Sequence, residues 1–297
     1  MMELGADVSD RPYEDGHERR RLMTVRSAYS EIVVDEMETA RYLWFGHARQ
    51  AGVRLRDGAF DFEVALASSQ RSFDLADLYQ PSVTSVLHVG LGAGNAAMRS
   101  ALRHPDAVVD VVEIDPAVVD VAVEWFGFDP DRCRVHLADA FVFLRSADAS
   151  WDRIMLDAFL SEGGTSQVNV YPSYFAESDF IDLLARRVAA DGLLMANLNG
   201  ALRGPSSGRL LRLLDFIERA FGHLAVHSVA DRTGESYALS EHPDLELPDD
   251  HYIALAGRRS LPSADEIRTR AEAAEGAVYV DPKIVAFAAN RIDAWRP

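Results

Sequence analysis

Residues 85–95 restrict the possible fold more than any other part of the chain, because they join an apolar run to three closely spaced glycines. The segment Val86–Val89 is typical of a buried strand, and Gly90, Gly92 and Gly94 follow it directly. Glycine can adopt positive φ angles and can pass close beneath a ligand. A strand, a glycine turn and a helix in this order predict a nucleotide-binding α/β unit.

An acidic residue at the end of the next expected strand extends the pattern. Glu113 lies 19 residues after Gly94 and closes an apolar segment that starts at Val108. A carboxylate at this place can accept hydrogen bonds from ribose hydroxyls. A dinucleotide fingerprint would put its third glycine at position 95, which is Asn95 here. The spacing therefore favours S-adenosylmethionine or a related nucleoside, and a purely structural glycine turn is the alternative. Asp115 and Pro116 are typical of a helix N-cap and first helical residue.

Strand and helix patterns alternate from Val83 onward, which predicts an α/β fold with an open, mostly parallel sheet and helices on both faces. We expect seven strands, at 85–89, 108–113, 133–137, 153–157, 192–198, 224–229 and 251–256. We expect helices at 94–104, 116–126, 139–146, 173–189 and 207–221. Ligands of such sheets bind at the carboxyl ends of the strands.

The chain divides into three parts on this reading. Residues 1–27 are polar and without periodicity, which predicts a mobile tail. Residues 28–80 predict a small β unit, with strands at 31–34, 41–45 and 52–56, followed by a linking helix over 61–79. Residues 81–297 form the expected nucleoside-binding catalytic domain, with a helical cover after Ser260.

Two more carboxylates follow expected strands. Asp139, with Ala140 after it, closes the third strand, where a carboxylate can accept a hydrogen bond from an adenine amino group or can simply cap a helix. Asp157 ends the fourth strand beside a Gly- and Ser-containing stretch, so we expect the loop 158–170 to close over the ligand. Asp157 is a candidate base or amine anchor, and a loop cap is the alternative.

The composition bears on the partners of the chain. The 47 acidic and 30 basic side chains give a formal net charge of −17, which disfavours nucleic acid and anionic membranes and suits a cationic substrate such as a polyamine. Acidic charge kept for solubility explains the same excess. Cys133 is the single cysteine and no apolar run reaches the length of a membrane span, so we expect a cytoplasmic protein. The spacing of the histidines predicts no metal site.

Taken together, these residues resemble the spermidine synthase (polyamine aminopropyltransferase) family over roughly residues 28–257. The resemblance is carried by Arg41-Tyr42-Leu43 with Gln50, Val112-Glu113-Ile114-Asp115, Asp139-Ala140 and Leu156-Asp157-Ala158-Phe159. It implies a Rossmann-like class I methyltransferase fold preceded by a β-hairpin unit. It also implies that Gln50, Glu113, Ile114, Asp139 and Ala140 contact the nucleoside and that Asp157 helps to deprotonate the attacking amine. A homodimer or homotetramer is implied as well.

Four positions depart from the family pattern. Ala93 replaces an aspartate of the glycine turn, and Leu160 replaces a second aspartate after Asp157. The tyrosine and glutamine of the polyamine pocket find their nearest counterparts in Phe62 and Glu63, which makes Glu63 a candidate substrate ligand. Three hypotheses stay open: aminopropyl transfer from decarboxylated S-adenosylmethionine to an amine, methyl transfer from intact S-adenosylmethionine, and nucleoside binding without catalysis.

Overall fold

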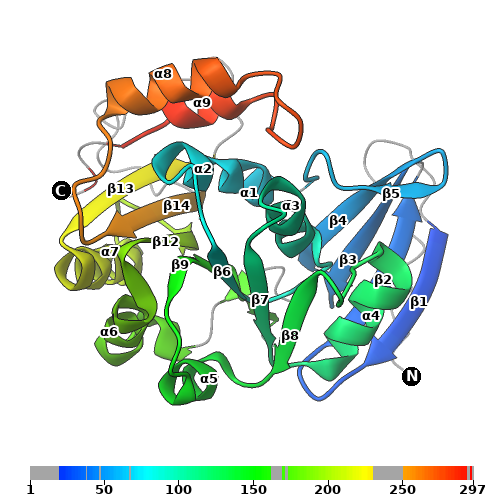
Figure 1. Ribbon diagram of the computed structural model, residues 1–297. Helices are drawn as coiled ribbons and strands as arrows, with labels where there is room; N and C mark the ends of the chain where they lie inside the picture. Colours follow the sequence, from blue (N-terminus) through cyan, green and yellow to red (C-terminus); the bar gives the residue numbers. More distant parts are fainter. Residues whose placement is uncertain are drawn as a thin grey trace.

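The computed structural model describes residues 20–37, 39–46, 48–66, 68–161, 169–170, 173–229, 250–292 and 295. The predicted α/β class is correct, and the chain places an antiparallel sheet before a larger, mostly parallel one (Figure 1).

The N-terminal sheet has five antiparallel strands that pair in chain order: β1 (Arg20–Arg26), β2 (Glu31–Met37), β3 (Ala40–Phe45), β4 (Ala48–Arg56) and β5 (Ala59–Asp61). We predicted three of them. β1 falls inside the segment expected to be a mobile tail, whose residues 1–19 lie outside the described part of the chain. Arg21 of β1 forms a 2.9 Å ion pair with Asp35 of β2. Cross-strand pairs of this kind stabilise a strand that has no apolar periodicity.

The linking segment is helical only in its second half, so the helix predicted over 61–79 starts too early. Helical structure begins with α1 (Ser68–Arg71) and continues through η2 (Ser72–Asp74) and α2 (Leu75–Tyr79). Before it, the Asp61 carboxylate accepts a 2.8 Å hydrogen bond from the Glu63 backbone N–H. Arg99 donates to the carbonyls of Phe62 and Glu63. These contacts use backbone and side-chain groups in a turn that competes with a helix.

The large sheet contains all seven predicted strands, in the order β13-β14-β12-β9-β6-β7-β8. The strands are β6 (Ser85–Val89), β7 (Val108–Glu113), β8 (Cys133–Leu137), β9 (Trp151–Leu156), β12 (Val188–Gly200), β13 (His223–Ser228) and β14 (Asp250–Gly257). β12, β9, β6, β7 and β8 run parallel, and β14 pairs antiparallel with both β12 and β13. The carboxyl ends of the parallel strands therefore share one edge of the sheet.

Helices cover both faces of this sheet, as predicted (Figure 1). One face packs against α5 (Ala140–Ser146), α6 (Ser178–Arg187) and α7 (Gly208–Phe221). The other packs against η2, α2, α3 (Asn95–Arg103), α4 (Pro116–Phe126), α8 (Ala264–Ala274) and α9 (Ile284–Ala289). The remaining short elements are β10 (Leu160–Ser161), β11 (Asn169–Val170) and η3 (Ser173–Ala176). The predicted helix 173–189 is thus η3 followed by α6, and the predicted helical cover after Ser260 contains α8 and α9.

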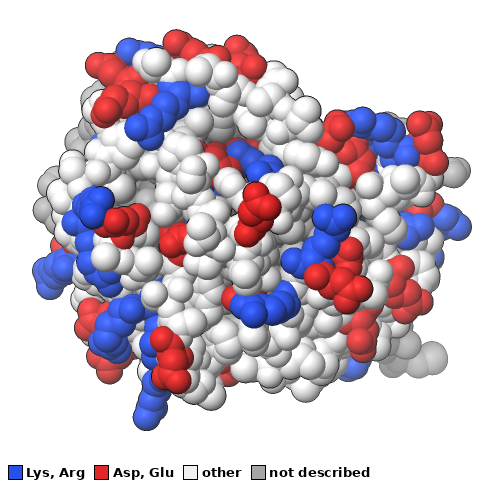
Figure 2. Space-filling model, in the orientation of Figure 1, with Lys and Arg blue, Asp and Glu red and all other residues white. Residues whose placement is uncertain are grey.

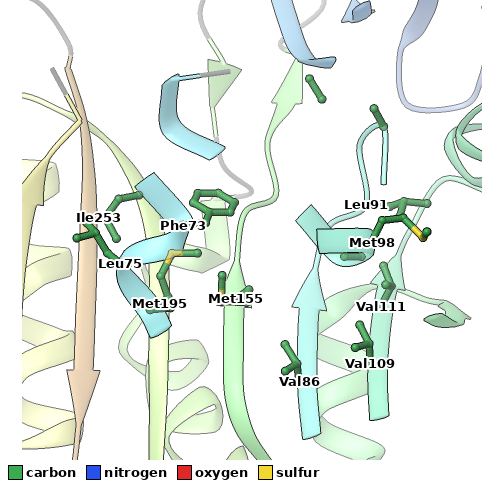
Figure 3. Packing of buried hydrophobic residues seen from close by; sticks show 14 of the residues in the cluster. Phe73, Leu75, Val86, Leu91, Met98, Val109, Val111, Met155, Met195 and Ile253 are labelled. Carbon is green, nitrogen blue, oxygen red and sulfur yellow. The ribbon is translucent and has the colours of Figure 1, made fainter. Parts of the chain in front are cut away.

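Alternate residues of the central strands belong to opposite cores, which is the two-residue period of a strand. Leu194 of β12 packs among α5, α6 and α7, whereas its neighbour Met195 faces the other side. Figure 3 shows Met195 and Met155 of β9 beneath Phe73 and Leu75, which are carried by η2 and α2. The segment α1–α2 is therefore seated on the sheet through apolar contacts.

Buried ion pairs fix the same segment. Asp74, which is buried, accepts from Arg99 at 2.8 Å and from Arg103 at 2.5 Å, both on α3. Asp77 accepts from Arg153 of β9 at 2.6 Å. Arg71 of α1 donates through two bonds, at 2.8 and 2.9 Å, to Asp281. Breaking such a pair leaves an uncompensated buried charge, so these contacts hold the segment α1–α2 in one position.

The surface charge is mixed on the face shown in Figure 2, where acidic and basic side chains are interspersed. In the part of the chain that the structure describes, none of the helices is both long and apolar enough to cross a membrane. Cys133 is buried, and burial raises the pKa of its thiol to about 12.

Candidate active site

The glycine turn closes tightly over the end of β9. Gly90, Gly92 and Gly94 all have positive φ, at 96°, 56° and 76°. A Cβ added to Gly90 would lie 2.5 Å from the carbonyl oxygen of Asp157, and one added to Gly94 would lie 2.6 Å from the Phe128 ring. Positive φ and these close approaches explain why glycine is needed. The turn therefore brings β6 directly beside Asp157.

Glu113 is held against this turn by three backbone amides. Its Oε2 accepts from Leu91 at 2.9 Å, and its Oε1 accepts from Ile114 and Asp115, also at 2.9 Å. Burial raises the pKa of Glu113, while these N–H donors lower it. The carboxylate is thus fixed in place, and lone pairs remain on Oε2 for a sugar hydroxyl. Asp115 caps α4, as predicted, through a 3.0 Å bond from Ala117.

Asp139 caps α5 and also binds a tyrosine. Its Oδ1 accepts from the backbone amides of Phe141 and Val142 at 2.9 and 3.1 Å. Its Oδ2 accepts a 2.8 Å hydrogen bond from the Tyr174 hydroxyl of η3. The helix-cap alternative is therefore correct for Oδ1. Oδ2 does not cap the helix and is bonded to the Tyr174 hydroxyl instead. An amino group of a bound base can compete for, or share, this oxygen.

Asp157 follows β9 and is enclosed by amides. Its Oδ1 accepts a 2.8 Å bond from the Asn197 side chain of β12, and the Gln70 side chain of α1 also donates to the Asp157 carboxylate. Burial raises the pKa of Asp157 to about 6, and the two amides act in the opposite direction. A carboxyl group with such a pKa exchanges a proton near neutral pH, which suits a general base.

These groups meet in one cavity of about 330 Å³. It is lined by eight of the predicted residues: Gln50, Gly90, Gly92, Glu113, Ile114, Asp139, Ala140 and Asp157. Its apolar lining includes Val89, Leu91, Val112, Val118, Ala138, Ala158, Phe159 and Phe175. A mostly apolar cavity with a few convergent polar groups is typical of a small-molecule site.

The N-terminal sheet supplies one wall of this cavity through a bulge. Leu43 pairs with Ala51 and Trp44 pairs with Arg49, so Gln50 is an extra residue in β4. A bulge turns consecutive side chains toward the same side. Arg49 and Gln50 consequently both line the cavity.

Two predicted residues do not line the cavity among the residues described. Gly94 packs beneath Phe128 instead. Glu63, expected to bind substrate, forms a 2.8 Å ion pair with Arg56, and 46% of its side chain is exposed. Ser69 and Gln70 of α1 line the cavity in its place. The loose match with Phe62 and Glu63 was wrong because the chain turns between β5 and α1.

The departures at Ala93 and Leu160 differ in what the structure describes. Ala93 is fully buried in the apolar core, so its side chain offers nothing to the cavity. Leu160 begins β10, whose two residues pair antiparallel with β11. Residues 162–168 of the expected closing loop 158–170 lie outside the described part of the chain. No metal-binding group of three or more His, Cys, Asp or Glu side chains occurs within the described ranges.

Sequence reasoning missed several lining residues, including Arg49, Gln70, Tyr174, Asn197 and His251. Asn197 carries a signal in retrospect, since it is a polar residue inside an otherwise apolar strand. His251 is the second residue of β14, and the spacing of the histidines in the sequence gave no indication of its place in the cavity. Arg49 and Gln70 reach the cavity through a bulge and a short helix, which no periodicity predicts.

Residues 73–201, less than half of the chain, match the spermine/spermidine synthase domain family. A polyamine aminopropyltransferase of Vibrio vulnificus is 29% identical over 177 residues, covering 58% of this chain and 57% of that protein. The match thus covers less than two thirds of the length of these curated relatives.

Solved structures share the fold, among them two with the following TM-scores. A probable spermidine synthase from Corynebacterium glutamicum superposes with a TM-score of 0.65 at 20% identity, covering 90% of this chain and 93% of that one. Human methyltransferase-like protein 13 in complex with SAH gives a TM-score of 0.54 at 19% identity, covering 78% and 96%. These likenesses establish the Rossmann-like methyltransferase architecture that we predicted, with an antiparallel sheet before it.

Proposed function

We propose that this chain, which carries a spermine/spermidine synthase domain over residues 73–201, moves an aminopropyl group from decarboxylated S-adenosylmethionine to a small-molecule amine. The observation that carries the proposal is the position of Asp157. A carboxyl group with a pKa of about 6 lies in the same cavity as the glycine turn and Glu113. The attacking amine needs a base at this place to accept its proton, and the other cavity groups suit a nucleoside.

The nucleoside is held, in this proposal, by groups that already have fixed orientations. Glu113 accepts from the ribose hydroxyls through Oε2, while Asp139 accepts from the adenine amino group. Ile114 and Ala140 contact the ring, and Gln50 closes the site from β4. Because backbone amides already hold the carboxylates of Glu113 and Asp139, these side chains lose little conformational entropy when the nucleoside binds.

The reaction is an in-line displacement at the carbon beside the sulfonium. The acceptor nitrogen forms the new C–N bond, the C–S bond breaks, and its electron pair stays on sulfur in methylthioadenosine. The acceptor ammonium loses its proton to Asp157, which leaves a lone pair for the attack. Fixing both substrates in one cavity makes the step effectively unimolecular.

The test of this proposal is a turnover assay with defined donors and acceptors. Purified protein with decarboxylated S-adenosylmethionine and putrescine, or a series of di- and polyamines, is expected to release methylthioadenosine. Release of S-adenosylhomocysteine from intact S-adenosylmethionine would instead support methyl transfer. Tight nucleoside binding with neither product would support a relative that has lost catalysis.

The activity should depend on pH in a defined direction. Ionised Asp157 is the active form, and burial raises its pKa to about 6. We therefore expect kcat/KM for the amine to fall as pH drops through about 6, with half of the plateau value near that pH. An acid limb near the ordinary pKa of aspartate, about 4, would contradict the assignment of Asp157 as the base.

Methyl transfer is the second candidate, and Arg49 favours it. Among the described residues that line the cavity, Arg49 is the one arginine, and the acidic side chains are those of Glu113, Asp115, Asp139 and Asp157. Its guanidinium lies 5.4 Å from the centroid of the Tyr42 ring. An arginine here suits the carboxylate of intact S-adenosylmethionine, while buried Ala93 offers no charge to an aminopropyl ammonium.

Replacing Arg49 by methionine tests which donor the cavity prefers. We expect Arg49→Met to shift the ratio of affinities by about tenfold toward the decarboxylated donor, because it removes one charge-assisted contact and one repulsion. Calorimetry with both nucleosides gives the ratio, and Arg54→Met on the same strand is the matched control. An unchanged ratio would show that Arg49 does not contact the donor tail.

The partners and location follow as part of the same proposal. The substrate class is a small-molecule amine rather than nucleic acid or a membrane, in keeping with the net charge of −17. We propose a cytoplasmic enzyme that assembles as a homodimer or homotetramer, since β1 is an edge strand of the antiparallel sheet among the residues described. Light scattering of the purified chain measures the assembly.

A further inference from the structure

Hydrogen bonds link three polar side chains in a row that starts at Asp157, the proposed base. Asp157 accepts from Asn197 Nδ2 at 2.8 Å, and Asn197 Oδ1 lies 3.2 Å from His251 Nδ1. Asn197 pairs with Ile253 across β12 and β14, and His251 pairs with Asn199. Asn197 and His251 therefore lie diagonally on one face of an antiparallel pair, within reach of each other.

The charge at one end of this line fixes the direction of every hydrogen bond in it. An ionised Asp157 can only accept, so Asn197 must turn its NH₂ group toward the carboxylate. Its carbonyl oxygen then faces His251, and only a protonated Nδ1 can donate to it. The tautomer of His251 is thus determined by a carboxylate two residues away along the hydrogen-bond chain.

We propose that His251 is a positioning residue of this site: its Nδ1–H holds the Asn197 amide in the orientation that donates to Asp157. This inference rests on the proposed function, because it concerns the group assigned as the base. Without the histidine, the Asn197 amide can rotate and present its oxygen to Asp157. That arrangement favours the protonated carboxyl group and so removes the base.

Other groups near the cavity do not provide this orientation. The remaining ionisable residues of the described lining are Tyr29 between β1 and β2, Arg49 on β4, Glu113 and Asp115 at the end of β7, Asp139 at the start of α5 and Tyr174 on η3. The causes of the shifted pKa of Asp157 are its burial and its bonds to Asn197 and Gln70. His251 also packs edge-on against Phe159, with ring centroids 6.1 Å apart, which is the purely structural explanation for its presence.

Two substitutions separate positioning from packing. In His251→Asn the side-chain amide nitrogen replaces Nδ1, whereas in His251→Gln it replaces Nε2. We expect His251→Asn to keep kcat/KM within about threefold of wild type. We expect His251→Gln and His251→Ala to move the acid limb upward by about one pH unit, which lowers kcat/KM at pH 5 by about tenfold. The KM for the donor should stay unchanged in all three variants.

A second measurement does not depend on turnover. Carboxyl ¹³C NMR, with Asp157→Asn to assign the signal, reports the pKa of Asp157 in each variant bound to methylthioadenosine. Upward shifts in His251→Gln and His251→Ala, but not in His251→Asn, support the proposal. Equal titration in all variants, or equal loss in Asn and Gln, would overturn it. Should wild type release no product from either donor, the proposed function fails, and this titration still decides the role of His251.

Discussion

Replacing Asp157 by asparagine should lower the rate of group transfer by about a thousandfold, which is within the usual range for removing a general base. Nucleoside binding should be retained, because Glu113, Asp139 and the glycine turn are untouched. Product release gives the rate, and calorimetry with methylthioadenosine gives the binding. The exposed Asp191→Asn is the control. A variant that turns over at the wild-type rate would remove Asp157 from the mechanism.

The same substitution should make the folded protein more stable at neutral pH. A carboxyl group whose pKa rises from 3.8 to about 6 on folding favours the protonated form in the folded state. Its ionisation therefore destabilises the fold progressively as pH rises from about 4 to about 6, by up to about 3 kcal/mol above that range. Asparagine avoids this cost, so Asp157→Asn should unfold at higher urea concentration at pH 7.5 and show little gain at pH 4.

The side chains around Asp157 can form hydrogen bonds with an asparagine at this position. Asn197 can still donate to its oxygen, and Gln70 can rotate so that Oε1 accepts from the new amide. The Gln70 Oε1 atom is buried and has no hydrogen-bond partner in the described structure. A gain in stability together with a loss of rate would mark Asp157 as a group retained for chemistry. Lower stability at pH 7.5 would contradict the assignment.

Replacing Gly90 by alanine should damage both the fold and the site. The new Cβ would lie 2.5 Å from the Asp157 carbonyl oxygen and 3.0 Å from the Ala158 Cβ, at a φ of +96°. Strain and backbone overlap together should cost about 3 kcal/mol or more. Because the turn must move away from β9, nucleoside affinity should fall at least a hundredfold. Urea unfolding and calorimetry measure the two effects.

Gly222 provides a matched control for this substitution. It ends α7 at a φ of +89°, yet nothing lies within 4 Å of the position of an added Cβ. Gly222→Ala should therefore cost only the conformational strain, about 1 kcal/mol, and leave nucleoside binding unchanged. If the two variants lost the same stability and neither lost affinity, the close approach of Gly90 to Asp157 would have no functional importance.

The regular elements of the large domain were predictable because their signals are local. Buried parallel strands are continuous apolar runs, and the two adjacent residues Asp115 and Pro116 mark the start of α4. The ends of β6, β7 and β9 meet at one edge whatever the details of packing, so Gly90, Glu113 and Asp157 could be placed together from their spacing. The family resemblance added Gln50 and the order of the roles.

The features that the sequence did not indicate depend on contacts between residues far apart in the chain. β1 is held by ion pairs across a strand pair, and the chain before α1 is turned by Asp61 and Arg99. The pocket position assigned to Glu63 failed for that reason. Asn197 and His251 come within 3.2 Å only because β12 and β14 pair antiparallel in one register.

The amino-acid sequence by itself determined the order of strands and helices, the nucleoside-type turn and the carboxylates at the strand ends, since each depends on neighbours a few residues away. Only the tertiary structure decided which amides surround Asp157 and which arginine reaches the cavity. It also decided at which glycine an added Cβ would overlap neighbouring atoms. Those features depend on atoms brought together from distant segments, where a shift of one residue in register changes every partner.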